Sequence, residues 1–157
     1  EYAAPFFDHI EKSPVSELEE YYINTCDIKS ASYLDIGFVL FGEDLKRGEF
    51  LVKLKEEHEK SGNDCGHELP DYLPNVLNLL SFSQDKEFCA EFVSFLLIPV
   101  LRTLIKDFKA SDNVYKGLLE FLLNVLIKDF GDSQQTDYKV LNSFDCKEAG
   151  ATCGLHC

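Results

Sequence analysis

Four side chains near the end of the chain could together bind a metal ion. Cys146, Cys153, His156 and Cys157 lie within twelve residues, and Zn²⁺ prefers thiolate and imidazole donors in tetrahedral sites. The cluster lacks the paired C-x-x-C spacing of zinc knuckles, and the adjacent His156 and Cys157 are awkward to place on one ion. Two interpretations remain open: a reduced tail without metal, which we favour, and a metal- or redox-responsive site.

The rest of the chain lacks the motifs typical of catalysis. It contains no G-x-x-x-x-G-K, no G-x-G-x-x-G, no G-x-S-x-G and no H-E-x-x-H. The pair His58-Glu59 lacks a second histidine four positions later. His58 falls on an apolar helical face, which favours a half-buried, hydrogen-bonded imidazole. The sequence therefore predicts a protein that is not an enzyme and holds no cofactor of its own.

Apolar residues recur with a helical period along nearly the whole chain, and no segment alternates in the way typical of strands. Ser83 and Ser111 are predicted to cap the two longest helices, and Gly131 to end the second of them. These patterns predict an all-α fold, a single-domain bundle of about six to seven helices over residues 1–131. Residues 132–157 are predicted to form a polar, Cys-containing tail that the bundle does not need.

The most apolar segment, from Ser83 to about Phe108, is predicted to be the central helix, bent at Pro99. Its most apolar stretch, Phe92 to Ile105, is shorter than a membrane span and carries Arg102. We therefore expect a buried core helix and no direct insertion into a membrane.

The charge of the chain restricts its partners. Lys and Arg total 15 against 28 Asp and Glu, giving a formal net charge of −13. Such a surface repels phosphate backbones and anionic lipid, so nucleic acid is an unfavourable partner. Cys26 and Cys89 fall in helical patterns and are expected to be free thiols, which favours a reducing compartment. The chain contains no Met, so we expect that Glu1 is not the translation start.

The segment Glu68-Leu-Pro-Asp-Tyr-Leu-Pro74 has the most specific local pattern. Pro70 favours an extended backbone before it, and Asp71 is placed to cap the helix that follows. One interpretation is therefore a rigid turn between two helices, in which Asp71 acts as a helix cap.

This segment resembles the E-L-P-D-H-L-P segment of the NarJ group, within the wider TorD/DmsD family of molybdoenzyme assembly chaperones. Upstream residues match in order and spacing: Tyr22, Asp27, Ser32 and Leu34 are similar to Y-x-x-x-x-D-x-x-x-x-(S/T)-x-L, and Gly42, Glu43, Arg47 and Gly48 to G-E-x-x-x-R-G. The resemblance covers about residues 6 to 130. Tyr72 departs from the pattern, because the family usually has His there.

The resemblance implies a cytoplasmic chaperone of a nitrate-reductase-like enzyme. Such a protein binds the N-terminal peptide of the catalytic, molybdopterin-containing subunit and supports insertion of the molybdenum cofactor and an iron–sulfur cluster. The partner-binding candidates that it implies are Glu68, Pro70, Asp71 and Tyr72. Asp27, Glu43 and Arg47 are further candidates, each of which could equally be a helix cap or part of an ion pair within the chain.

Overall fold

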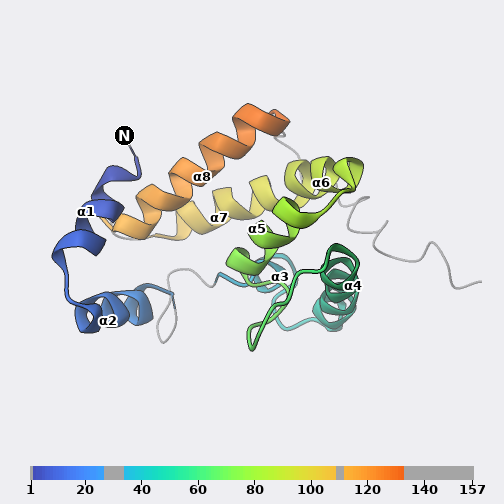
Figure 1. Ribbon diagram of the computed structural model, residues 1–157, viewed down its shortest axis with the longest axis horizontal. Helices are drawn as coiled ribbons and strands as arrows, with labels where there is room; N and C mark the ends of the chain where they lie inside the picture. Colours follow the sequence, from blue (N-terminus) through green and yellow to red (C-terminus); the bar gives the residue numbers. More distant parts are fainter. Residues whose placement is uncertain (1, 27–33, 109–111, 133–157) are drawn as a thin grey trace, which may run out of the picture.

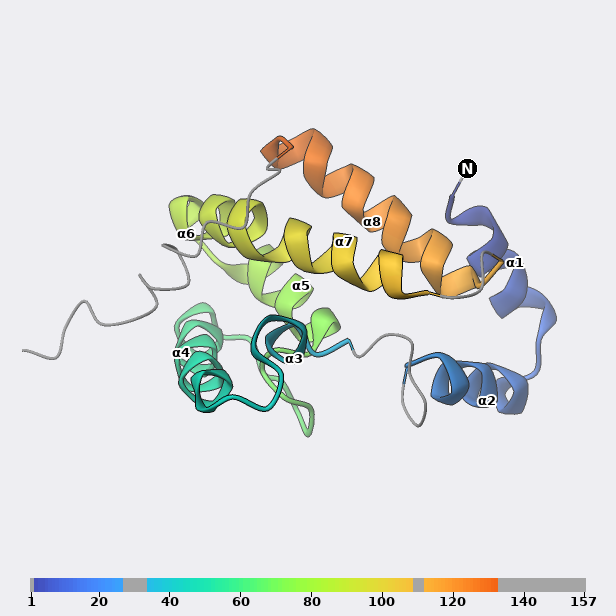
Figure 2. The same cartoon turned by 180° about the vertical axis from the view of Figure 1, so that it is seen from behind.

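The computed structural model describes residues 2–26, 34–108 and 112–132. Within these ranges every regular element is helical (Figures 1 and 2), apart from one isolated antiparallel bridge between Asp35 and Tyr72. The elements are α1 (Ala4–Lys12), α2 (Val15–Cys26), α3 (Ile36–Phe41), α4 (Leu45–Ser61), α5 (Leu73–Phe82), α6 (Lys86–Phe92), the π-helical η1 (Val93–Leu97), α7 (Ile98–Asp107) and α8 (Val114–Phe130). Since α6, η1 and α7 form one continuous helix, the described residues contain seven helices. The predicted all-α bundle is confirmed.

The continuous helix from Lys86 to Asp107 forms the centre of the fold. Phe92, Leu96, Leu97, Leu101 and Leu104 along it are almost completely buried. α8 packs along α7, α3 packs against both α7 and α4, and α5 packs against α4. In both views α3, α4 and α5 lie together on one side of α7, opposite α8. The central helix thus supports the two layers on either side of it.

Pro99 lies within this helix, where the sequence predicted a bend. The helix continues through it by way of the π-helical turn Val93–Leu97, in which the N–H of Ile98 bonds to the carbonyl of Val93. A proline has no N–H, and its ring crowds the carbonyl four residues earlier, here that of Phe95. The wider π turn lies at the place where this conflict arises.

The central helix, Lys86–Asp107, lies within the predicted range from Ser83 to about Phe108. It spans 22 residues, with a mean hydropathy of 1.9 in its most apolar window, and is long and apolar enough to cross a membrane by length and composition. Half of that window is buried inside the fold, which is the arrangement of a core helix.

Two of the predicted helix caps are replaced by neighbouring residues. Asp85, not Ser83, caps the central helix, since its side chain accepts a hydrogen bond from the backbone N–H of Phe88. Asn113 caps α8 by accepting from the N–H of Tyr115, while Ser111 lies outside the described residues. In both cases an equally favourable capping side chain lies two residues further along the chain.

α1 and α2 lie at the end of the molecule away from α4. α1 packs against α8, and the carbonyl of Tyr2 comes so close to Gly117 that an added Cβ would lie 2.8 Å from its oxygen. α2 is attached by side-chain contacts: the hydroxyl of Tyr21 accepts from the N–H of Val114, and Asn113 donates to the hydroxyl of Thr25.

Several predictions fall on residues that the structure does not describe. The tail from residue 133 onward lies outside the described ranges, and with it the cluster of Cys146, Cys153, His156 and Cys157. The division between a helical domain and a dispensable tail therefore stays a prediction. Within the described part, the three cysteines, Cys26, Cys65 and Cys89, are free thiols.

Candidate functional site

The segment Glu68–Pro74 forms a tight turn that leads into α5 and is fixed to the start of α3. The backbone N–H of Ile36 donates to the carbonyl of Asp71 at 2.9 Å, and that of Leu73 donates to the carbonyl of Leu34 at 2.8 Å. These two bonds flank the bridge between Asp35 and Tyr72. The turn is therefore joined to a segment more than thirty residues earlier in the chain.

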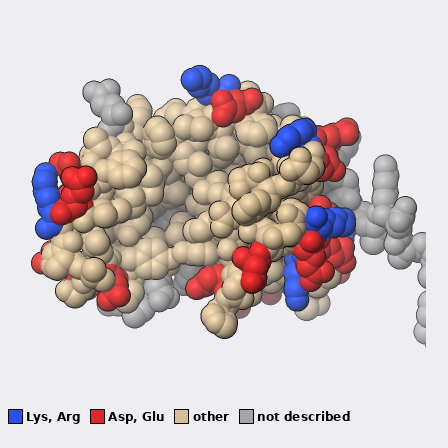
Figure 3. Space-filling model, viewed as in Figure 1, with Lys and Arg blue, Asp and Glu red and all other residues tan. Residues whose placement is uncertain are grey.

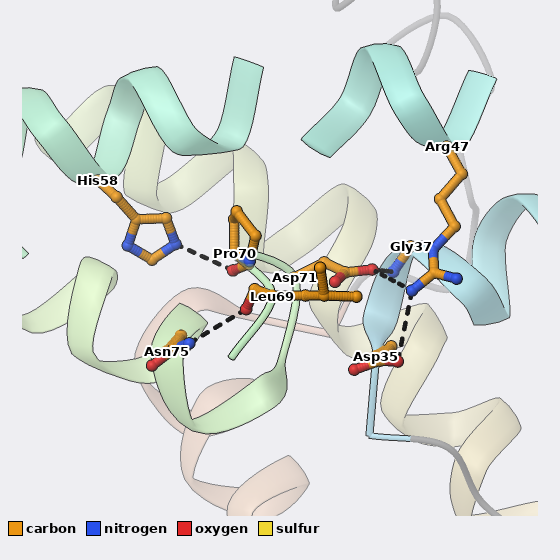
Figure 4. A network of polar contacts seen from close by, with 8 residues as sticks. All are labelled: Asp35, Gly37, Arg47, His58, Leu69, Pro70, Asp71 and Asn75. Atoms are coloured by element: carbon orange, nitrogen blue, oxygen red, sulfur yellow. Dashed lines mark hydrogen bonds and ion pairs between the residues drawn. The ribbon is translucent and has the colours of Figure 1, made fainter. Parts of the chain in front are cut away.

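Asp71 is the centre of this arrangement (Figure 4). Its side chain is 0% exposed, and Oδ2 accepts from the backbone N–H of Gly37 at 3.1 Å and from Nη2 of Arg47 at 3.3 Å. The prediction that Asp71 caps the following helix is wrong: the N-cap position of α5 is Tyr72, and no side chain caps it. Burial raises the pKa of the Asp71 carboxyl above its ordinary value, although the charge of Arg47 acts in the opposite direction.

Arg47 reaches this carboxylate from the first part of α4. Its Nη2 lies 3.3 Å from Oδ2 of Asp35 and 3.3 Å from Oδ2 of Asp71, and its guanidinium lies 5.4 Å from the centroid of the Phe38 ring. The sequence leaves Arg47 open as a partner contact, a helix cap or part of an ion pair, and the structure shows the ion pair within the chain. Arg47 links α4 to the start of α3 and to the turn.

The other side of the turn is fixed by a second set of polar side chains, also drawn in Figure 4. His58, from the last part of α4, is 1% exposed and donates from Nε2 to the carbonyl of Pro70 at 2.9 Å. Asn75 donates to the carbonyl of Leu69 at 3.1 Å. The prediction of a hydrogen-bonded His58 is confirmed, and its burial is deeper than expected. The bond from His58 gives the Pro70 carbonyl a side-chain partner, and the Leu69 carbonyl accepts both from Asn75 and from the N–H of Tyr72.

Tyr72 connects the turn to α2. Its hydroxyl lies 2.8 Å from that of Tyr22, and the ring of Tyr22 packs edge-on against that of Tyr115. Burial, together with the hydrogen bond to Tyr72, raises the pKa of Tyr22. The Tyr22 hydroxyl therefore stays neutral at physiological pH, and one of the two hydroxyls donates to the other.

The hydroxyl pair should be measurable as a modest contribution to stability. Replacing Tyr72 by Phe is expected to lower the free energy of unfolding by about 1 kcal/mol, the net value of one hydrogen bond. Tyr22→Phe should cost a similar amount, and the double variant little more than either, because both changes remove the same bond. Urea denaturation of the three variants measures this. Additive losses would show that the two hydroxyls stabilise the fold separately.

Among the predicted partner-binding residues, the turn exposes some and buries others. Glu68 and Glu43 are exposed, and Leu69, at the tip of the turn, is 45% exposed. Pro70 and Tyr72 are half-buried, whereas Asp71 is inaccessible. Asp27 lies outside the described residues. A partner that docks on this turn would meet Glu68 and Leu69 directly.

Sequence reasoning missed a cleft at the other end of the molecule. An open cavity of about 600 Å³ lies between α1, α2 and the start of α8, with Glu17, Glu20 and Asp112 in its lining and the rings of His9 and Tyr21 4.7 Å apart. None of the described lining residues is a Lys or Arg. The three-residue spacing of Glu17 and Glu20 places both on one face of α2. The cleft forms only because the start of α8 lies beside that face.

Most of the face seen in Figure 3 is uncharged, and the Lys, Arg, Asp and Glu side chains lie mainly around its margin. Exposed apolar side chains occur on α8, where Phe121 is 44% and Val125 37% exposed. Within the described ranges no three His, Cys, Asp or Glu side chains are grouped so as to hold a metal ion. Exposed apolar side chains with charged groups at the margin are an arrangement that suits the docking of another protein.

Comparison with known proteins gives one informative relative. No family model matches the chain, and no solved structure matches it. The chain is 30% identical over 122 residues to the probable nitrate reductase molybdenum cofactor assembly chaperone NarJ of Bacillus subtilis (strain 168). The alignment covers 77% of this chain and 65% of that protein, so the chain spans less than two thirds of its relative's length. The resemblance first seen in the motifs is thus confirmed: over most of its length the chain is similar to a NarJ-type assembly chaperone.

Proposed function

We propose that this protein is a cytoplasmic, non-catalytic assembly chaperone of a nitrate-reductase-like molybdoenzyme. It binds the N-terminal peptide of the molybdopterin-containing catalytic subunit and supports insertion of the molybdenum cofactor and an iron–sulfur cluster. The observation that carries the proposal is the 30% identity to NarJ over most of the chain. The cofactors belong to the client enzyme. The chaperone inserts into no membrane and binds no nucleic acid.

Three surfaces support a peptide ligand. The turn Glu68–Pro74 holds Glu68 and Leu69 out to solvent on a backbone fixed by buried hydrogen bonds, so little freedom is lost when a partner contacts them. The cleft with Glu17 and Glu20 in its lining has the charge to accept Lys or Arg side chains of the same peptide. The largely uncharged surface between charged margins fits the apolar face of an amphipathic peptide.

Isothermal titration with a peptide copying the N-terminus of the cognate catalytic subunit tests the proposal. We expect saturable binding at a protein concentration of about 50 µM, a range that detects micromolar affinities. Affinity should fall several-fold between about 0.05 and 0.5 M salt, because exposed charges are screened over a shorter distance. No heat with this peptide, or equal heat with a scrambled peptide, would count against a chaperone that recognises this segment.

A pair of charge variants locates the basic residues of the peptide. The double variant Glu17→Gln/Glu20→Gln removes two charges from the cleft and should bind more weakly, with a smaller salt dependence. Glu87→Gln/Glu91→Gln removes the same charge from exposed positions on the central helix and is the matched control. Equal behaviour of the two variants would show that the cleft contributes only through the overall charge.

A further inference from the structure

α4 holds the turn at two consecutive residues, through side chains from opposite ends of the helix. Arg47, in its first turn, pairs with the carboxylate of Asp71 at 3.3 Å, and His58, in its last turn, bonds to the carbonyl of Pro70 at 2.9 Å. Figure 4 shows the two contacts on either side of the turn. The position of the turn is therefore set by α4 and not only by the helix that follows it.

The partners of His58 determine which ring nitrogen carries the proton. The carbonyl of Pro70 can only accept, so Nε2 carries a hydrogen and donates. On the other side, Nδ2 of Asn63 lies 2.8 Å from Nδ1 and also 3.3 Å from the carbonyl of Asn75. Turning the amide of Asn63 around would bring its oxygen against that carbonyl, so Nδ2 stays the donor and Nδ1 the acceptor. His58 is thus the neutral imidazole with its proton on Nε2.

His58 serves two polar groups at once, because one ring nitrogen donates and the other accepts. The network joins the end of α4, the loop at Asn63 and the first turn of α5 to the carbonyl of Pro70. His58 is 1% exposed, so it cannot touch a partner and acts only through the residues that it holds. The residues directly before Pro70 are Glu68 and Leu69, which are exposed.

We propose that His58 is a positioning residue for client binding: as the neutral Nε2–H tautomer, it fixes the Pro70 carbonyl and so holds Glu68 and Leu69 in the orientation that the client peptide contacts. This inference rests on the proposed function for the identity of the ligand. The tautomer and the hold on the turn are properties of the free protein and can be measured without a ligand.

The experiment compares four proteins: wild type, His58→Leu, His58→Gln and Leu54→Ala. His58→Leu removes both ring hydrogen bonds, whereas the amide of Gln can still donate to the Pro70 carbonyl. Leu54 is 0% exposed on the same helix but has no hydrogen bond to the turn, so Leu54→Ala weakens the core alone. All four are studied at a temperature at which each is fully folded, as judged by circular dichroism.

Three readouts are expected to agree. The ¹⁵N NMR chemical shifts of the His58 ring in the wild type should show that Nε2 is protonated and that Nδ1 is not. The N–H of Tyr72 bonds to the carbonyl of Leu69 within the turn, and that of Glu68 bonds to the carbonyl of Cys65 just before it. Amide hydrogen exchange at both should rise about tenfold more in His58→Leu than in Leu54→Ala. Peptide dissociation constants should rise about tenfold in His58→Leu, be largely restored in His58→Gln, and stay near the wild-type value in Leu54→Ala.

Each failure has its own meaning. A ring protonated on Nδ1, or exchange in the turn that rises equally in His58→Leu and Leu54→Ala, would overturn the positioning role. Wild-type binding that persists unchanged in His58→Leu, despite a loosened turn, would overturn the link between this turn and the client. Absence of peptide binding by the wild type would refute the proposed function, while the exchange and nitrogen shifts would still decide whether His58 holds the turn.

Discussion

Replacing Asp71 by Ala is expected to lower the free energy of unfolding by about 3 kcal/mol. The substitution removes a side chain that is 0% exposed, leaves the N–H of Gly37 without its acceptor, and takes one of two carboxylates from Arg47. A helix cap, the role that the sequence suggested, would cost only about 1 kcal/mol. Urea denaturation followed by circular dichroism separates the two values.

Asp35→Ala is the matched control, because it removes the other carboxylate bound to Arg47. The Asp35 side chain is 30% exposed, so this pair is partly screened by solvent and should be worth less than about 1 kcal/mol. Equal losses in Asp71→Ala and Asp35→Ala would show that the buried bond to Gly37 adds nothing. Because Asp71 is inaccessible, its loss should weaken peptide binding only by shifting the turn.

The same carboxyl gives a dependence of stability on pH with a definite sign. Burial raises the pKa of Asp71 above its ordinary value of 3.8, so the folded protein holds this proton more tightly than the unfolded chain. The stabilising contribution of the protonated group is complete below pH 3.8 and is lost as the pH rises through the folded pKa. The unfolding free energy of wild type minus that of Asp71→Asn should therefore fall with rising pH in this range.

Gly37→Ala is the second substitution for which a large effect is expected. A Cβ at this position would lie 2.6 Å from Oδ2 of Asp71 and 3.0 Å from the ring of Phe50, both of them buried. Relieving this contact means moving the carboxylate away from its donors, so we expect a loss of about 3 kcal/mol, the upper part of the range for overpacked cores.

Gly48→Ala provides a control of opposite sign. Gly48 lies within α4, and an added Cβ would meet nothing within 4 Å. Alanine is favoured over glycine inside a helix by about 0.5–1 kcal/mol, so this variant should be more stable than wild type. Thermal melts of both variants provide the comparison. If both are stabilised, the approach of Asp71 to the start of α3 is looser than the structure shows.

The helices were predictable where the signal is local. Asp44 caps α4, Gly62 ends it in the left-handed conformation, and Gly131 ends α8 with a φ of 87°. Each of these residues acts through the backbone within a few positions of itself, so its type and place are enough. The central helix was predictable because it contains the most apolar long window of the described chain.

The candidate site was predictable in its location but not in its chemistry. An Asp before a helix gives the same local pattern whether it caps that helix or, like Asp71, bonds to Gly37 34 residues away. Arg47 could not be assigned to an ion pair until the fold brought Asp35 and Asp71 to it. The cleft at Glu17 was missed for the same reason, because no single segment contains both of its walls.

The close approach of Asp71 to Gly37 has a consequence for how this sequence can change over time. The carboxylate of Asp71 fills the space that a side chain at position 37 would need, and Arg47 balances the charge of that carboxylate. Substitutions at these three positions are therefore not independent: one that is harmful alone becomes tolerable only after another has made room or removed the charge. We therefore expect these three positions, which lie far apart in the sequence, to change together.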